Sequence, residues 1–208
     1  MDEKFVINIG RQLGSGGREI GKKLSTELNI AFFDKELINI ASQESGLQKE
    51  FFEKADEKAS RGISGLLGLR FPFINDGPIS SNNYLSNDSL FKIQSDVIRN
   101  LSEKKSCLFV GRCADYILRD NSRCVNIFIS APLEDRIKRI CKTTKITPEK
   151  AEEIIVKTDR ERASYYNYYS YKVWGAASTY HLCIDSSILG TDETVSFIKL
   201  FIKKKLEL

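Results

Sequence analysis

The chain has 208 residues, of which 41% are hydrophobic and 29% are charged, and its formal net charge is +4. This is the composition of an ordinary globular protein, and a chain of this length buries enough surface to fold without disulfides or metals. No apolar run approaches the ~18 residues that a membrane-spanning helix requires. The mild positive charge suits an anionic ligand and a solvated surface equally well. We therefore expect one domain, or one domain with an inserted flap.

The cysteine and histidine content limits which metal sites and catalytic groups the chain can form. The five cysteines are an odd number and form no C-x-x-C pair, which suits a reducing cytosol and gives no zinc-site spacing. Cys107, Cys124 and Cys183 lie in or beside apolar strand-like runs, where a thiol is usually a small buried hydrophobe. His181 is the only histidine. A metal site with several histidines is therefore excluded, and Ser–His catalysis is not expected. The N-terminal stretch starts acidic and moves straight into a strand, unlike a signal peptide, and we expect a cytoplasmic protein.

Short apolar strands alternate with helical patterns along the chain. The predicted strands are, in chain order, 5–9, 30–34, 106–111, 124–131 and 180–186. The predicted helices are, in chain order, about 18–28, 35–45, 50–58, 90–105, 112–120, 132–143, 147–171 and 191–205. This alternation predicts an α/β fold of three layers, in which helices cover both faces of a parallel sheet.

Several helix starts carry a recognisable signal. Asn87 or Ser89 precedes the helix expected from residue 90, and Thr191 precedes the closing helix. Thr147 is followed at once by Pro148, a combination typical of an N-cap and the first helical residue.

Residues 60–89 differ in character from the rest of the chain. They are rich in Gly, Ser and Asn and hold two of the four prolines, without a clear period. Leu66, Leu67 and Phe71 make the stretch too apolar for a plain disordered linker. We interpret it as a loop or flap whose apolar residues cover something, because long loops in compact domains are often lids.

Polar or glycine-rich residues follow the first three predicted strands. Gly14–Arg18 follow the first strand, Asp34 ends the second, and Gly111 with Arg112 ends the third. Ligands of parallel α/β sheets bind at the carboxyl ends of the strands. The coincidence of the three positions predicts a site at that edge.

The glycine-rich stretch has the chemistry of a phosphate-binding loop. Gly14, Ser15, Gly16 and Gly17 allow successive backbone N–H groups to point at an anion, and the helix that follows adds partial positive charge. The pattern G-x-x-x-x-G-K-[ST] also needs a lysine and a hydroxyl, and here Arg18 and Glu19 stand near those places. Arg18 can grip phosphate in a two-pronged way. A second register, Gly16 to Lys22, starts the helix too late, and a purely structural turn remains the alternative.

Six segments, taken together and in order, resemble the cytidylate kinase-like family of P-loop proteins, which is akin to bacterial cytidylate kinase and other nucleoside monophosphate kinases. They are GSGGREIGKKL (14–24), FFDKELI (32–38), FVGRCADYIL (109–118), IFISAPLEDRIKRI (127–140), TDRERASYYNYYSYKVWG (158–175) and YHLCIDSS (180–187). The resemblance implies a P-loop fold with a five-stranded parallel core, a flap that binds a nucleoside monophosphate and an arginine-bearing lid. On this basis the core is 1–40, 90–140 and 178–208, the flap about 41–89 and the lid about 141–177.

The activity that the resemblance implies is transfer of the γ-phosphoryl group of ATP to CMP, dCMP or a related small acceptor, with Mg²⁺. The residues that match the phosphate loop and would bind ATP are Gly14, Ser15, Gly16, Gly17 and Arg18. The residues expected to bind the acceptor are Asp34, Arg112, Asp115, Arg136 and Asp159. Arg18 from the loop and Arg160 and Arg162 from the lid are expected to act in catalysis, because phosphoryl transfer depends on alignment and positive charge. No metal ligand is assigned.

Three features depart from the family pattern: the missing loop lysine and hydroxyl, Lys35 as the only cation in the DKELINI stretch, and a flap without an obvious base-reading set. Two alternatives therefore stay open, a nucleotide-binding regulator without catalysis and a kinase of a non-nucleotide small molecule. The tyrosine-rich segment 165–171 could stack on nucleic-acid bases, but we expect it and Trp174 to pack on the core. Membrane binding through Lys203–Lys205 is not expected, because the inward face of that helix is needed for the core.

Overall fold

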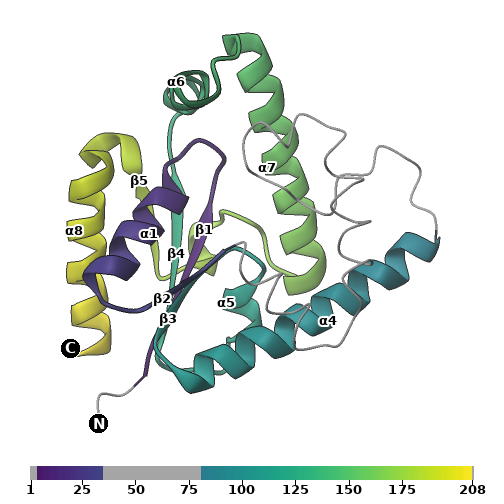
Figure 1. Ribbon diagram of the computed structural model, residues 1–208, viewed down its shortest axis with the longest axis vertical. Coiled ribbons are helices and arrows are strands. Elements are labelled where there is room, and N and C mark those ends of the chain that lie inside the picture. The colour runs from purple at the N-terminus through teal and green to yellow at the C-terminus, as the bar shows by residue number, and fades with distance from the viewer. Residues whose placement is uncertain (1–3, 35–80, 208) are drawn as a thin grey trace. The chain divides into compact units, whose positions relative to one another are not determined.

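The computed structural model describes residues 4–34 and 81–207. The chain divides into two compact units, Met1–Asp34 with Arg99–Leu208, and Lys35–Ile98. We call the first the core unit. The described elements are β1 (Val6–Arg11), α1 (Gly17–Glu27), β2 (Ala31–Phe33), α4 (Ser81–Lys104), β3 (Cys107–Val110), α5 (Ala114–Ile117), β4 (Cys124–Ser130), α6 (Leu133–Thr144), α7 (Pro148–Ser170), the 3₁₀ turn η2 (Ala177–Thr179), β5 (Leu182–Asp185) and α8 (Ser186–Leu206) (Figure 1).

The core unit is built on one parallel sheet. Its five strands follow the order β2-β3-β1-β4-β5, and every adjacent pair is parallel. The first strand is therefore central: Val6 lies opposite Cys107 of β3 on one side and Cys124 of β4 on the other. The expected five-stranded parallel core is confirmed, and the loop that follows β1 leaves the middle of the sheet.

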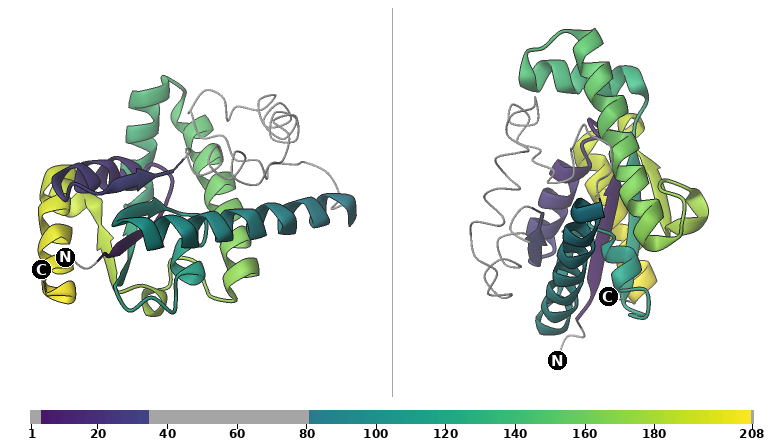
Figure 2. Two further views of the ribbon diagram at one scale, coloured as in Figure 1. Left: turned by 60° about the horizontal axis from the view of Figure 1, so that its bottom comes forward. Right: turned by 90° about the vertical axis from the view of Figure 1, so that its right-hand side faces the viewer.

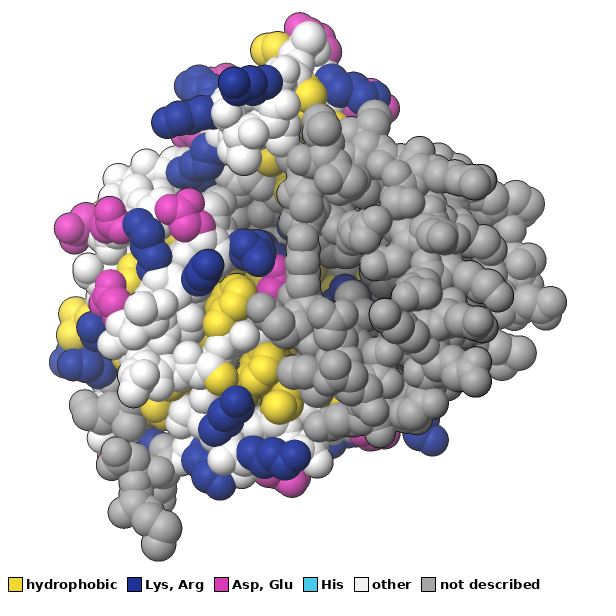
Figure 3. Space-filling view, viewed as in Figure 1, with side chains coloured by type: hydrophobic (Ala, Val, Ile, Leu, Met, Phe, Trp, Pro, Cys, Tyr) yellow, Lys and Arg dark blue, Asp and Glu magenta, His cyan; other side chains and the backbone are white. Residues whose placement is uncertain are grey.

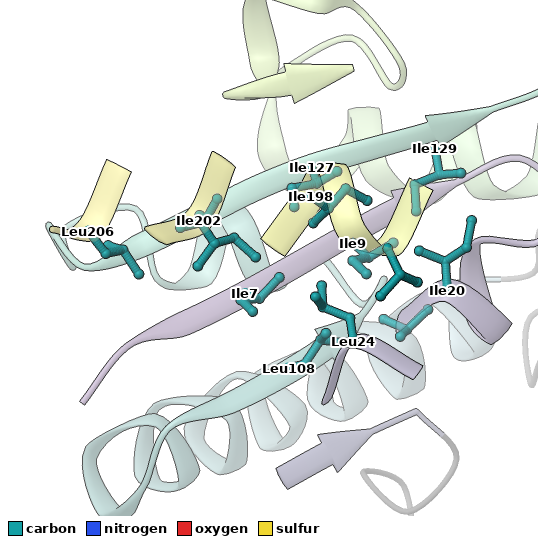
Figure 4. Close-up of a cluster of buried hydrophobic side chains, with 13 residues drawn as sticks. Ile7, Ile9, Ile20, Leu24, Leu108, Ile127, Ile129, Ile198, Ile202 and Leu206 are labelled. Atoms are coloured by element: carbon teal, nitrogen blue, oxygen red, sulfur yellow. The ribbon is translucent and has the colours of Figure 1, made fainter. Parts of the chain in front are cut away.

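One face of the sheet is covered by α1 and α8. Ile7 and Ile9 lie two residues apart on β1 and so point to the same face, where they meet Ile20 of α1 and Ile198 of α8 (Figure 4). All four side chains are at most 1% exposed. Burial of an aliphatic side chain stabilises the folded state by about 1.5–3 kcal/mol. These contacts therefore hold the first turns of α1 against the sheet.

The opposite face is covered by α7 and the segment after it. Figures 1 and 2 show α7 on the other side of β1 from α1. On this face Phe128 of β4 meets Trp174 edge-on, with ring centroids 5.1 Å apart, and Tyr180 at 5.0 Å. Tyr166 of α7 is 5% exposed and stacks on Tyr180. The three-layer α/β prediction is confirmed, and Tyr166 and Trp174 pack on the core as expected, whereas Tyr171 is 89% exposed.

Helix boundaries agree with the sequence signals at some positions and differ at others. Thr147 is the N-cap of α7 and its side chain accepts a hydrogen bond from the Lys150 N–H, with Pro148 as the first helical residue. The prediction that α4 begins near residue 90 is wrong, because it begins at Ser81. Its first residues, rich in Ser, Asn and Asp, have weak helix propensity and no apolar period, but adding turns to an existing helix costs little.

A short helical segment precedes the closing helix that was predicted to begin at Thr191. It starts at Ser186, and Asp185 accepts a capping hydrogen bond from the Ser187 N–H at 2.8 Å. Gly190 then adopts φ 72°, which breaks the helix, and Thr191 marks the point where it resumes. The short Asp-Ser-Ser start therefore forms an extra turn that the apolar period did not reveal.

The structure also bears on the predictions for the cysteines, for membrane-spanning helices and for the flap. Cys107 and Cys124 are buried as expected, but Cys183 is exposed; the prediction for it is wrong because β5 is the last strand of the sheet and leaves part of its surface uncovered. No helix in the described ranges is long and apolar enough to cross a membrane. The helices expected at 35–58 and the flap up to residue 80 lie outside the described residues.

Candidate active site

The predicted phosphate loop connects the central strand to α1 at the carboxyl edge of the sheet. Gly14 and Gly16 adopt φ values of 78° and 76°, in the left-handed region that glycine tolerates best. Gly16 is the N-cap of α1 and has no side chain to cap it, and the Gly17 N–H donates a long hydrogen bond to Ser15 Oγ at 3.4 Å. The first amide groups of a helix lack intrahelical partners, so a helix start at this edge is suited to bind an anion.

Two charged residues from α6 and α7 hold the loop by its backbone. Asp159 accepts a hydrogen bond from the Leu13 N–H at 2.8 Å, and Arg136 donates to the other carboxylate oxygen of Asp159 at 2.6 Å. The same Nη1 atom of Arg136 lies 3.4 Å from the Leu13 carbonyl oxygen. A Cβ at Gly14 would stand 2.9 Å from the Arg136 Cβ and carbonyl oxygen, so the loop lies directly against α6. Arg136 and Asp159 were predicted to bind the acceptor; their observed contacts fix the loop.

Arg139 and Ser186 hold the next two residues of the loop. Arg139 Nη1 donates to the Gly14 carbonyl oxygen at 3.2 Å and to the Ser186 Oγ at 3.3 Å. Ser186 in turn donates to the Ser15 carbonyl oxygen at 2.6 Å. Neither Arg139 nor Ser186 was predicted from the sequence. Arg139 lies three residues after Arg136, on the same side of α6, and this spacing is the signal that could have suggested it.

Arg11 and Arg162 bring two guanidinium groups to the end of β1. Arg162 Nη1 donates to the Arg11 carbonyl oxygen at 3.0 Å, and the Arg162 side chain is 8% exposed. Burial, and next the charge of Arg11, lower the pKa of Arg162 to about 9, so it stays protonated at neutral pH. Burial also lowers the pKa of Arg11. Buried cations of this kind are stable only with partners of opposite charge.

The charges around Arg11 come from four segments. Asp34 and Asp159 raise its pKa, whereas Arg112 and Arg18 lower it. The sequence analysis did not select Arg11, because it stands at the end of the strand rather than within the glycine loop. With Arg11 and Arg162 included, arginines outnumber carboxylates in this group. The excess of positive charge favours the binding of an anion.

Arg18 and Asp34 form an ion pair. Arg18 Nε donates to Asp34 Oδ2 at 2.7 Å, and the two side chains are 50% and 14% exposed. The first residues of α1 and the residue after β2 are thus brought together, as the strand-end argument predicted. Arg112, after β3, has φ 61° and acts electrostatically on Arg11, so all three predicted strand ends contribute to one neighbourhood.

Asp115 and Arg160 are placed differently from the residues around the loop. Asp115 of α5 is 7% exposed and accepts a hydrogen bond from the Tyr166 hydroxyl of α7 at 2.5 Å. Burial raises the pKa of Asp115, and the Tyr166 bond opposes that rise. This contact ties α5 to α7. Arg160 is exposed on α7, in contrast to Arg162.

In the described part of the chain, no group of three or more His, Cys, Asp or Glu side chains could hold a metal ion. Glu19, Asp34 and Asp159 near the loop each lie beside a cation: Lys23, Arg18 and Arg136 respectively. Mg²⁺ in kinases is bound largely through substrate phosphates and water with one or two carboxylates, and these residues identify no dedicated metal ligand.

Comparison with known families agrees with this geometry. A family model described as the cytidylate kinase-like family matches residues 6–188. The chain belongs to the cytidylate kinase-like family. The matched range runs from the first residue of β1 to the start of α8 and includes the loop, Asp34, Arg112 and the whole of α7. The resemblance on which the sequence analysis relied is thereby confirmed.

Solved structures place this cytidylate kinase-like chain among P-loop kinase folds. An uncharacterized protein from Eubacterium ventriosum ATCC 27560 is 27% identical, with a TM-score of 0.71 over 96% of this chain and 99% of that one. Shikimate kinase from Bacteroides thetaiotaomicron is 13% identical, with a TM-score of 0.52 over 98% and 99%. Shikimate kinase from Acinetobacter baumannii in complex with shikimate is 13% identical, with a TM-score of 0.51 over 99% and 97%. At these identities the shikimate kinases establish the fold alone. No curated protein matches the chain.

Proposed function

We propose that this protein is an ATP-dependent phosphotransferase that moves the γ-phosphoryl group to CMP, dCMP or a related small acceptor. One observation carries the proposal: a glycine-rich helix start at the central strand of a kinase-like sheet, with Arg11, Arg18 and Arg162 around it. Phosphoryl transfer needs alignment and compensation of negative charge more than covalent help. Arginines from several segments supply both.

In this proposal the loop and the arginines divide the phosphates between them. The backbone from Gly14 to Gly17 and the first amides of α1 bind the ATP phosphates, as helix starts commonly do. Arg162, with Arg18 and Arg160, neutralises charge on the transferred group. Asp34 and Arg112 bind the acceptor. The contacts of Asp115, Arg136 and Asp159 support a positioning role, since each already bonds to α7 or to the loop.

The transfer step is balanced without an outside reagent. The bond between the γ-phosphorus and the oxygen that bridges to ADP breaks, and a bond forms between that phosphorus and an oxygen of the acceptor phosphate. A monophosphate dianion attacks without losing a proton, so no strong base is required. Mg²⁺ bound with ATP would offset part of the negative charge of the phosphates; the residues assigned here orient the phosphates and exclude water.

We propose a small-molecule partner and a cytoplasmic location for this protein. In Figure 3 acidic and basic side chains lie side by side at the end formed by α6 and the start of α7, which supports a small-molecule partner rather than a nucleic acid. All five cysteines are free, which supports a reducing, cytoplasmic location. We propose no membrane partner.

A second candidate function is a kinase of a non-nucleotide small molecule. It is favoured by the fold shared with shikimate kinases and by the loop sequence GSGGRE, in which no lysine followed by Ser or Thr ends the glycine run. A nucleotide-binding regulator without catalysis is the third, favoured by the same altered loop.

A coupled ADP-release assay tests the three candidates. Mg·ATP is offered with each nucleoside monophosphate in turn, with shikimate, and without acceptor, while calorimetry measures ATP binding. We expect turnover with CMP or dCMP well above the rate without acceptor. Turnover with shikimate alone would favour the small-molecule kinase. ATP binding without turnover on any acceptor offered would contradict a nucleoside monophosphate kinase and leave the regulator and a kinase of another small molecule to be separated.

A further inference from the structure

The start of α1 fixes the register of the phosphate loop. In the pattern G-x-x-x-x-G-K-[ST] the lysine directly follows the last glycine of the loop. Gly16 is the N-cap of α1 and Gly17 is its first residue. In that register Gly17 stands at the lysine position and Arg11 at the position of the first glycine. The two positions have exchanged their residue types: a cation stands where glycine belongs, and a glycine stands where the cation belongs.

These two residues touch. A Cβ added to Gly17 would stand 2.6 Å from the Arg11 Cβ and 3.2 Å from its Cγ. Real Cβ atoms do not approach so closely, and the Arg11 Cβ cannot swing away as the end of a flexible side chain could. The stem of Arg11 therefore fills the space that a side chain at residue 17 would need.

The far end of Arg11 lies at the end of the neighbouring strand. A Cβ added to Gly111 would overlap the Arg11 Nη1 atom, and Gly111 has φ 78°. Gly111 follows β3, which pairs with β1. The Arg11 side chain thus passes over the first residue of α1 and ends at the carboxyl edge between β1 and β3, where ligands of such sheets bind.

Arg11 and Arg18 differ in how their charge is compensated. Arg18 is half exposed and bonds directly to Asp34 at 2.7 Å. Arg11 meets Asp34 and Asp159 only as neighbouring charges, beside the opposing charges of Arg112 and Arg18. The buried Arg162 bonds to its carbonyl oxygen. An anion bound at this edge would offset two guanidinium groups together.

We propose that Arg11 is the phosphate-binding cation of this loop and takes the role that lysine has in the usual pattern. Gly17 is a glycine because this side chain crosses it, and Gly111, whose φ of 78° favours glycine, leaves room for the Arg11 guanidinium to end beside it. The inference rests on the proposed function for its ligand class, the polyphosphate chain of a nucleotide. It gives the charge-compensating role to a residue from the end of the strand rather than from the helix.

The first test measures anion affinity. Calorimetry with ATP and with inorganic tripolyphosphate compares wild type with Arg11→Gln, Arg18→Gln and Arg119→Gln; Arg119 is exposed and lies over the Tyr116 ring, 4.5 Å from its centroid. We expect Arg11→Gln to weaken both ligands at least about tenfold, which is about 1.4 kcal/mol. Arg18→Gln should lose less, and Arg119→Gln should bind like wild type. Equal affinity of Arg11→Gln and wild type, or a larger loss in Arg18→Gln, would overturn the proposal.

The second test reverses the exchange. Gly17→Lys alone should lower the melting temperature, because its Cβ collides with the Arg11 stem. Arg11→Gly alone should fold and lose tripolyphosphate affinity. The double variant Arg11→Gly with Gly17→Lys restores the usual pattern at both positions, and we expect its affinity to return to within about fivefold of wild type. A folded double variant that binds no better than Arg11→Gly would overturn the proposal.

The two proposals fail in different ways. Arg11-dependent binding of tripolyphosphate without turnover on any acceptor would support this inference and contradict the proposed kinase activity. Turnover with CMP that survives Arg11→Gln unchanged would do the reverse. A wild-type protein that binds neither ATP nor tripolyphosphate would overturn both.

Discussion

Individual side chains in this protein act on the backbone of one loop. The Leu13 peptide is bonded on both sides, its N–H to Asp159 and its carbonyl oxygen to Arg136. The Gly14 and Ser15 carbonyl oxygens bond to Arg139 and Ser186. Glycine loses more backbone conformational entropy on folding than other residues do. These hydrogen bonds from outside the loop offset that entropic cost.

Among the side chains that bond to the loop, Asp159 should contribute most to the free energy of unfolding. Asp159→Asn keeps an acceptor for the Leu13 N–H but leaves Arg136, whose side chain is 10% exposed, without its counter-charge. We expect the free energy of unfolding to fall by about 3 kcal/mol, measured by urea denaturation.

The matched control is Glu152→Gln, which changes an exposed carboxylate on the same helix. It should stay within about 0.5 kcal/mol of wild type. A loss below about 1 kcal/mol in Asp159→Asn would show that the pair does not fix the loop.

Whole elements place these side chains. α8 supplies Ser186 from its first turn, and farther along it packs Val195, Ile198 and Ile202 on the sheet beside α1 (Figure 4). α7 carries Asp159 and Arg162 on its loop-facing side and Tyr166 farther along. The loop is therefore held by helices that are themselves fixed by the core.

The two sides of α8 give a prediction about this element. Ile198 is fully buried, whereas Leu200 is 54% exposed. Ile198→Ala should lower the free energy of unfolding by about 2–5 kcal/mol, because it leaves a cavity between helix and sheet. Leu200→Ala should change it by about 0.5 kcal/mol or less. Urea denaturation of both variants decides, and equal losses would contradict the burial described here.

At the scale of the whole molecule, the free thiols report on folding. Cys107, Cys113 and Cys124 are buried, Cys141 is partly exposed and Cys183 is exposed. Burial raises the pKa of Cys107 to about 12 and that of Cys124 to about 11, and the thiolate is the reactive form.

We expect a thiol-specific reagent to modify Cys183 and then Cys141 in the native protein. The other three cysteines should react only as the protein unfolds, with the same urea midpoint as the loss of helical circular dichroism. Mass spectrometry identifies the modified positions. Reaction of Cys107 in the native protein at the rate of Cys183 would contradict the buried sheet.

From the sequence alone we could predict the alternation of strands and helices, the N-cap at Thr147 and the meeting of residues that follow the first three strands. These are local properties: apolar period, capping chemistry and the residues that follow a strand. The assembled fold was needed to establish that Arg11 reaches Gly111, that Arg139 and Asp159 bond to the loop, and that Cys183 lies on an exposed edge. Those facts depend on which distant segments become neighbours when the sheet assembles, and no local pattern contains that information.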